Sequence, residues 1–187
     1  NIQEMVKKHK LLTTWKYEWK PLYRGYTDKT LYINVDTNEV KEKQVPPEMK
    51  EKFIGGKGYD LRLLWDATKP NTKWNDPENE IVISSGPIGG ITQYSGTGKS
   101  IVCTISPQTD IVIDSNVGGF FGPFLKFSGY DAIEIQGKAR NEIIIYIFRK
   151  VISCYEIFSK SVLFLIIFEV EVINKSTCPY CSIYFIL

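Results

Sequence analysis

The chain has 187 residues, a length that suits one domain or one and a half. Hydrophobic residues make up 43% and charged residues 24%, which is typical of a globular protein. The formal net charge of +2 argues against a dedicated nucleic-acid-binding module, because such modules usually carry a strong basic excess. The longest apolar run, 162–168, is far shorter than the roughly 18 residues of a membrane-spanning helix, and the first twenty residues lack the apolar core of a secretory signal. We therefore expect a soluble, cytoplasmic protein that acts neither on nucleic acid nor in a membrane.

Residues 1–25 are predicted to form an N-terminal arm. Trp15 and Trp19 are four residues apart, with Leu11, Leu12 and lysines around them. This spacing weakly favours an amphipathic helix that packs on the main body. An arm that binds a partner is the alternative.

The central segment, 26–149, is predicted to consist of short strands with few helices. An alternating run at 30–35, a turn at Asp36-Thr37-Asn38 and a second run at 39–44 predict a β-hairpin. Short helices are expected at 48–54 and 58–68, the second with a mostly apolar face that includes Trp65, and 71–79 is expected to be a loop. A helical turn or two is expected within 121–130, and further strands at 80–85, 100–105, 110–114, 132–136 and 142–148. Because the helices do not alternate regularly with the strands, the fold class is α+β, β-rich, with largely antiparallel sheet.

Residues 150–187 form an atypical tail. All 14 glycines lie between Gly25 and Gly137, and the tail is rich in Ile and Phe and poor in turn residues. Such a composition is typical of AT-rich DNA translated out of frame. We hypothesise a frameshift or read-through near Lys150, which reading the coding DNA in the other two frames would test.

A glycine-rich turn at 95–100 resembles the end of a phosphate-binding P-loop. Gln93 stands where that motif needs its first glycine, and a β-branched run follows Lys99 where the motif needs a helix. A nucleotide triphosphatase is therefore not expected. Two interpretations stay open: a turn whose N–H groups and lysine hold a phosphate or another anion, and a hairpin turn with a solvated lysine.

A second dense segment spans 114–122. Asn116 offers an amide oxygen to a hard cation such as magnesium, Asp114 offers a carboxylate, and Gly118-Gly119 allows close approach of a ligand to the backbone. An Asn-containing turn beside an aromatic plug is the alternative.

Cysteine and histidine chemistry is not expected to carry the function. Cys178-Pro179-Tyr180-Cys181 matches a redox CxxC motif, but only six residues follow it and no helix can start there. His9 is the only histidine, which argues against a His-based triad or metal site. Cys103 lies in a predicted strand and is expected to be buried and structural.

Several segments in order resemble the N-terminal domain of the tungsten-containing aldehyde ferredoxin oxidoreductase family. They cover residues 26–149, and the Ser-Pro-Gln-Thr stretch is closer to the branch that contains the tungsten subunit of benzoyl-CoA reductase. The segments that carry the resemblance are Phe53-Ile54-Gly55-Gly56-Lys57-Gly58, Leu63-Leu64-Trp65-Asp66, Pro77-Glu78-Asn79, 81–87, 96–100, Ser106-Pro107-Gln108-Thr109, 115–122, 125–133 and Gln136-Gly137-Lys138-Ala139.

The resemblance implies a domain of two sheets that forms a base under a tungsten or molybdenum bis-pterin cofactor. Asn116 matches the family's Asn near the magnesium that bridges the two pterin phosphates, and Lys99 stands where the family commonly has an Arg between pterin and cluster. Lys keeps the charge of Arg but not its planar fork. The residues expected to bind the cofactor are Gly96, Thr97, Gly98, Lys99, Asn116, Gly118 and Gly119.

The resemblance also implies an oxidoreductase that acts on aldehydes or oxo groups and passes electrons to ferredoxin. The [4Fe-4S] cluster ligands and the catalytic groups would lie in later domains, so this chain is expected to be truncated and inactive alone. Ferredoxin, the remaining domains of the same enzyme and a second copy of the chain are the candidate partners. The alternative is a non-catalytic binding or scaffold module derived from the same domain.

Overall fold

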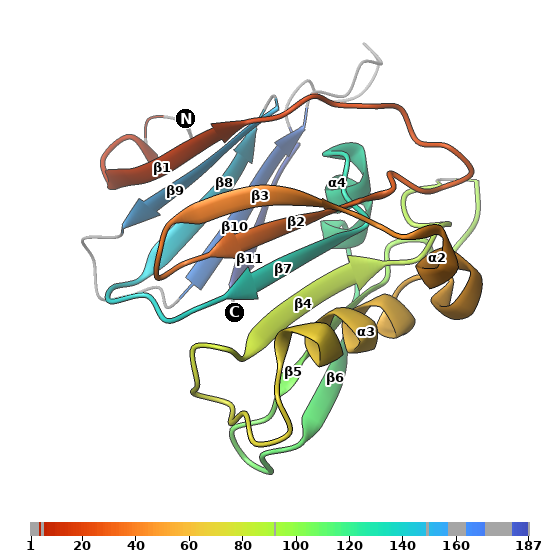
Figure 1. Ribbon diagram of the computed structural model, residues 1–187. Helices are drawn as coiled ribbons and strands as arrows, with labels where there is room; N and C mark the ends of the chain where they lie inside the picture. The colour runs from red at the N-terminus through yellow and green to blue at the C-terminus, as the bar shows by residue number, and fades with distance from the viewer. Residues whose placement is uncertain are drawn as a thin grey trace. The chain divides into compact units, whose positions relative to one another are not determined.

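The computed structural model describes residues 4, 6–91, 93–148, 150–156, 164–170 and 181–186. The chain divides into two compact units, Lys20–Lys138 and the combination of Asn1–Trp19 with Ala139–Leu187. Each unit is built on one β-sheet, and short helices accompany the sheet of the first (Figure 1). The α+β class with largely antiparallel strands is confirmed, because among the described strands only two pairs, β2 with β7 and β8 with β10, are parallel.

The unit Lys20–Lys138 contains a six-stranded sheet in the order β3-β2-β7-β4-β5-β6. Its strands are β2 (Lys29–Asn34), β3 (Glu39–Gln44), β4 (Glu80–Ser85), β5 (Ser100–Ile105), β6 (Val112–Val117) and β7 (Ala132–Gln136). Its helices are α2 (Pro47–Phe53), α3 (Lys57–Ala67) and α4 (Phe121–Phe127). The predicted hairpin is confirmed as β2 paired antiparallel with β3, and Asn38 takes the positive φ of 60° that its turn requires.

Helix α3 packs on one face of this sheet, against β4 and β5 (Figure 1). Leu64 of α3 is buried in a cluster with Val82, Cys103 and Ala132. We call this face, which also carries Glu80 and Glu134, the helix-α3 face. The prediction that Trp65 belongs to the apolar side of the helix was wrong, because Trp65 is 77% exposed and Leu64 takes the core position.

The second unit, which combines the two ends of the chain, contains a five-stranded sheet in the order β1-β9-β8-β10-β11. Its strands are β1 (Lys10–Lys16), β8 (Ile143–Phe148), β9 (Val151–Glu156), β10 (Phe164–Val170) and β11 (Cys181–Ile186). The proposed boundary between residues 149 and 150 falls in the turn between β8 and β9, which pair antiparallel. The tail hypothesis itself stays a prediction that only the coding DNA can test.

The predicted N-terminal amphipathic helix was wrong over Trp15, which lies in strand β1. Two β-branched threonines and the aromatic Trp15 favour a strand there. Strand β1 pairs antiparallel with β9, and Lys10 and Glu156 form an ion pair of 3.0 Å across the two strands. Tertiary pairing with a distant segment therefore overrides the weak helical spacing.

Strand β6 begins and ends later than the predicted 110–114. Asp110 has a positive φ of 54°, and its N–H donates to the Ser106 carbonyl, so the turn uses residues up to Ile111. The strand then continues to Val117, which lies opposite Ser100. Asn116 consequently belongs to a strand and not to a turn.

Candidate functional site

The two glycine-rich segments singled out in the sequence meet at one end of the β5–β6 pair. Ser100 at the start of β5 lies opposite Val117 at the end of β6, so Lys99 and Gly118 flank the same end of the pair. A Cβ atom on Gly98 would overlap the carbonyl oxygen of Gly119. The two backbones therefore approach so closely that position 98 requires glycine.

The backbone at this end of the sheet is open toward its surroundings. Gly96 and Gly119 have φ of +83° and +98°, and no atom lies within 4 Å of a Cβ built on either. The N–H of Gly90 donates to the carbonyl of Thr97 at 3.0 Å, and the Thr97 hydroxyl donates to the carbonyl of Tyr94 at 3.2 Å. Internal hydrogen bonds therefore hold the loop before β5 in place, and the backbone of its glycine Gly96 is accessible to a ligand.

Lys99 and Asn116 present polar groups at the same end of the sheet. Both are exposed. The Lys99 Nζ lies 3.4 Å from the position that a Cβ on Gly118 would occupy, which is an ordinary contact distance. Strand β5 begins directly after Lys99, so the expectation that this is not a P-loop is confirmed.

Asn116 and Asp114 lie on the helix-α3 face, because they are opposite Ile101 and Cys103 of β5. Asp114 accepts an ion pair from Lys57 at 2.6 Å. The hydrogen bond to Asp114, followed by its charge, raises the pKa of Lys57. The Asp114 carboxylate is therefore already engaged, and Asn116 is an accessible oxygen ligand on this face at the end of the strand.

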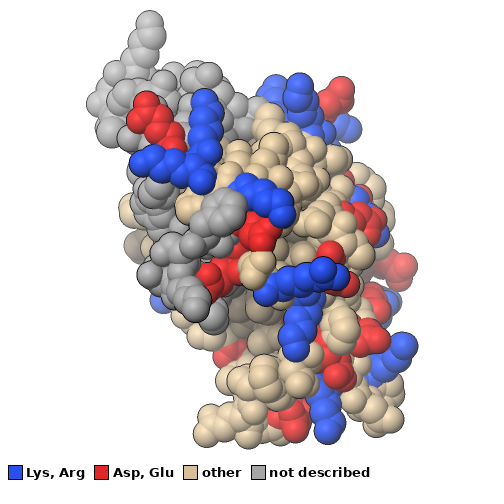
Figure 2. All heavy atoms as spheres, turned by 90° about the vertical axis from the view of Figure 1, so that its left-hand side faces the viewer, with Lys and Arg blue, Asp and Glu red and all other residues tan. Residues whose placement is uncertain are grey.

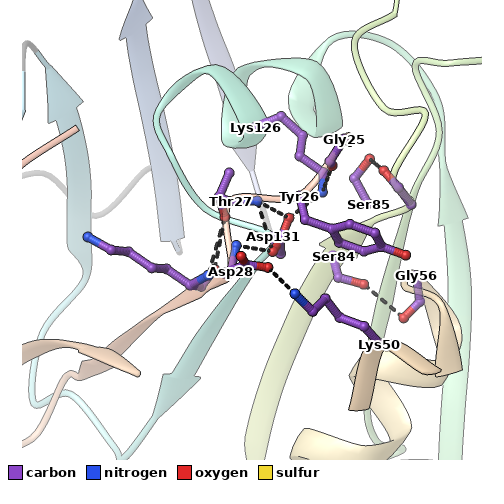
Figure 3. Close-up of polar contacts among 12 residues, drawn as sticks. Gly25, Tyr26, Thr27, Asp28, Lys50, Gly56, Ser84, Ser85, Lys126 and Asp131 are labelled. Carbon is purple, nitrogen blue, oxygen red and sulfur yellow. Dashed lines mark hydrogen bonds and ion pairs between the residues drawn. The ribbon is translucent and has the colours of Figure 1, made fainter. Parts of the chain in front are cut away.

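Sequence reasoning missed a buried polar clamp that holds the neighbouring loops (Figure 3). Asp131 accepts hydrogen bonds from the backbone N–H groups of Thr27 and Asp28 and forms an ion pair with Lys126. Lys126 also donates to the carbonyl of Gly25 at 3.0 Å. The side chains of Lys126 and Asp131 are 1% and 0% exposed. A lysine within the apolar run of α4 is the signal that could have indicated a buried partner.

Glycines also set the spacing of the loops around this clamp. A Cβ on Gly25 would overlap the carbonyl oxygen of Pro87, and one on Gly55 would lie 3.3 Å from the Cα of Gly86. The hydroxyl of Ser84 donates to the carbonyl of Gly56 at 2.9 Å (Figure 3). The segment before β2 and the connection between α2 and α3 therefore both pack against the backbone of the loop after β4.

Among the described residues, two buried carboxyl groups lack a hydrogen bond of good geometry, although Ser84 lies beside Asp60 and Glu134 beside Glu80. Asp60, in the first turn of α3, is 0% exposed, and burial raises its pKa well above the ordinary value. Glu80, at the start of β4, is 1% exposed, and its pKa is raised to about 8 by burial and then by the charge of Glu134. Neither residue was singled out by the sequence.

Two of the cysteines, Cys103 and Cys154, are structural. Cys103 and Cys154 are buried free thiols, and burial raises the pKa of each to about 12, which keeps them protonated and unreactive. The burial expected for Cys103 is confirmed. Cys178 lies outside the described residues, and Cys181 begins β11. Within the part of the chain that is described, no three His, Cys, Asp or Glu side chains gather as a metal site.

The surface carries charges of both signs. Basic and acidic side chains are interspersed on the face shown in Figure 2, and neither forms a continuous field there. Among the residues that are described, no helix has the length and apolar character needed to cross a membrane.

Comparison with known proteins gives a consistent result. Residues 30–162 match the family model described as the N-terminal domain of aldehyde ferredoxin oxidoreductase. The tungsten-containing aldehyde ferredoxin oxidoreductase of Pyrococcus furiosus is 36% identical over 123 residues, which cover 66% of this chain and 20% of that protein. The corresponding enzyme of Thermococcus kodakarensis is 37% identical over the same length.

More distant members of the same group also match. The WOR-like subunit of an aliphatic sulfonate oxidoreductase from Pyrococcus furiosus is 33% identical over 126 residues. A solved structure of the active-site complex BamBC of benzoyl coenzyme A reductase, with 1,5-dienoyl-CoA, superposes with a TM-score of 0.67 at 30% identity, covering 71% of this chain and 20% of that one. The chain therefore spans 20% of the length of these relatives.

Proposed function

Because the chain belongs to the aldehyde ferredoxin oxidoreductase family through its N-terminal domain, we propose that it is the cofactor-holding part of a tungsten or molybdenum bis-pterin oxidoreductase. The observation that carries this proposal is the open glycine backbone at the end of β5 and β6, flanked by Lys99 and Asn116. The family of oxidoreductases gives the reaction class. Aldehydes or oxo groups as substrates and ferredoxin as electron acceptor are part of the proposal.

The residues present at this end of the sheet fit such a group. Gly96 and Gly119 leave space where side chains would stand, so pterin phosphates can approach the backbone N–H groups. Lys99 would supply a positive charge to neutralise phosphate, and the Asn116 oxygen would be a suitable ligand for a magnesium ion. Thr97, Gly98 and Gly118 shape the loops that carry these groups.

The bound cofactor supplies the redox chemistry, and this chain's residues bind and orient it. The [4Fe-4S] cluster and the acid–base groups are proposed to belong to the rest of the enzyme, which makes the other domains the first partner of this chain. On this proposal the chain alone does not catalyse the reaction.

The test uses an intact homologous enzyme in which the position equivalent to Asn116 is changed to Ala. We expect tungsten, magnesium and pterin contents per protein to fall, because the magnesium ion would lose an oxygen ligand. Ser115→Ala is the matched control, since Ser115 is an exposed neighbour on the same strand that points to the opposite face. Unchanged metal content in the Asn116→Ala enzyme would defeat the role.

Metal analysis of the purified chain separates the two readings of its function. A chain that retains pterin and tungsten is a cofactor-holding module by itself. A folded chain without either would leave only a scaffold that requires the other domains to complete the site.

A further inference from the structure

Strands β3 and β6 form the two edges of the six-stranded sheet (Figure 1). Among the described strands, none pairs with the outer side of either. An edge strand presents unpaired backbone N–H and C=O groups along its outer side, and another strand can bind them. Proteins protect such edges with charged side chains, prolines, bulges or covering loops. The two edges of this sheet differ in this respect.

Strand β3 is a protected edge. Four of its six residues are charged, namely Glu39, Lys41, Glu42 and Lys43. A further strand laid along β3 would take these charges out of water, which is unfavourable. The composition of β3 therefore keeps this edge free of other strands.

Strand β6 lacks such protection. Its sequence, Val-Ile-Asp-Ser-Asn-Val, contains no proline or lysine, and its one charged residue, Asp114, is paired with Lys57 at 2.6 Å. Its pairing with β5 runs over six consecutive residues without a bulge that would turn the edge away. Val112 and Ile113 are half-exposed, and Ile111 just before the strand is exposed. A regular backbone edge with three consecutive apolar side chains is therefore accessible.

The two faces of β6 are also uncovered. All six of its residues are at least partly exposed, whereas β5 beside it contains three buried residues. Helix α3 packs on β4 and β5. Val112 lies on the helix-α3 face and Ile113 on the opposite face, because side chains alternate along a strand. A neighbouring strand would find apolar side chains on both faces.

Exposed apolar surface continues from β6 onto helix α3. Lys57, Leu61 and Trp65 are spaced by four residues, so they share one side of the helix. Because Lys57 reaches Asp114 of β6, this side is turned toward β6. Leu61 and Trp65 are both exposed. We call the outer side of β6, together with Ile111, Leu61 and Trp65, the β6 edge.

The rest of the enzyme is the partner that fits this edge. The chain spans 20% of the length of its relatives, so most of a relative has no counterpart in it. Asn116, near the end of β6, is proposed to hold a cofactor that the other domains share, so those domains have to approach this strand. A second copy of the chain paired along β6 would cover the same strand and keep those domains away.

We propose that the β6 edge receives a β-strand from the part of the enzyme that has no counterpart in this chain. This inference rests on the proposed function, because the shared cofactor brings the other domains to β6. The added strand hydrogen-bonds to the outward N–H and C=O groups of β6 and extends the sheet. It carries apolar side chains beside 111–113 and polar ones beside 114–116. The strand that bears Asn116 is then held from both sides.

Hydrogen exchange tests whether the edge is covered, by comparing the 187-residue chain with an intact homologous enzyme. In the chain, the β6 amides that point away from β5 should exchange as fast as the outward amides of β3. In the intact enzyme, the equivalent β6 amides should exchange at least about tenfold more slowly than those of β3, because the added strand binds them. Equal exchange of the two edges in the intact enzyme overturns the proposal.

Photo-cross-linking identifies the occupant. A photoreactive residue is placed in the intact enzyme at the position equivalent to Ile113. We expect a cross-link within the same polypeptide, to a segment outside the part that matches this chain. The position equivalent to Gln44, exposed on β3, is the control and should give no such product. A cross-link to a second copy, seen as a dimer on a denaturing gel, or no cross-link from the Ile113 position, overturns the proposal.

The metal content of the Asn116→Ala enzyme tests the cofactor role separately. If the metal content falls while the β6 edge is uncovered, this inference fails and the proposed function stands. If the edge is covered by the same polypeptide while the metal content is unchanged, the assignment of this surface stands and the proposed function fails at Asn116.

Discussion

The buried pair of Lys126 and Asp131 gives the sharpest prediction about stability (Figure 3). In Lys126→Met the alkyl stem is kept and the ammonium group is lost. Asp131 then keeps two backbone N–H donors, from Thr27 and Asp28, without a cation, and the Gly25 carbonyl loses its donor. Removing one partner of a buried ion pair costs about 3–5 kcal/mol, which is a large part of the total stability of a domain.

The reciprocal variant, Asp131→Asn, should cost a similar amount. Burial lowers the pKa of Lys126, and the neighbouring Asp131 opposes that effect. Without the carboxylate, the ammonium group is buried with no counter-charge. The double variant should lose less than the sum of the single variants, with an interaction of about 1–3 kcal/mol, because each single change strands the other charge.

Urea unfolding provides the measurement, with hydrogen exchange of the β2 and β7 amides as a local readout. Lys52→Met is the matched control, since the Lys52–Glu48 pair is 66% and 73% exposed. Exposed pairs of this kind contribute no more than about 0.5 kcal/mol. A Lys126→Met chain that unfolds within about 1 kcal/mol of the wild type, or no earlier than Lys52→Met, would refute the assignment of this pair as the clamp.

Three further predictions concern other parts of the same unit. The free energy of unfolding should fall as the pH rises from the ordinary glutamate pKa of 4.5 to about 8. The reason is that the folded chain retains a proton on Glu80 that the unfolded chain has already released. Glu80→Gln should remove this pH dependence, which thermal melts at a series of pH values would measure. Gly98→Ala should lower the free energy of unfolding by about 1–3 kcal/mol in urea, because the new methyl group would overlap the Gly119 carbonyl oxygen. Gly118→Ala is the control and should be tolerated, since its methyl group would make an ordinary contact of 3.4 Å with the Lys99 Nζ. Equal effects of the two substitutions would contradict the close approach of the Gly98 and Gly119 backbones. Ile113→Lys on edge strand β6, where the residue is 50% exposed, should change the free energy of unfolding by less than about 0.5 kcal/mol in urea unfolding; a larger loss would show that Ile113 is part of the core.

Local patterns predicted most of the elements in the central segment. Alternation and a polar turn define the β2–β3 hairpin, and the buried run at 80–85 becomes β4 with its expected bounds. The β-branched residues after Lys99 correctly indicated a strand, which removed the nucleotide triphosphatase from consideration. These features depend on neighbouring residues alone, so one sequence is enough to indicate them.

The features that the sequence did not indicate depend on distant segments. The clamp joins Thr27 to Asp131, residues separated by 104 positions. The Glu80–Glu134 pair arises because β7 inserts between β2 and β4, an order that local patterning does not specify. Strand β1 forms where helical spacing was weak because β9 supplies its partner. In each case sheet order decides what a residue contacts, and sheet order is a property of the whole chain.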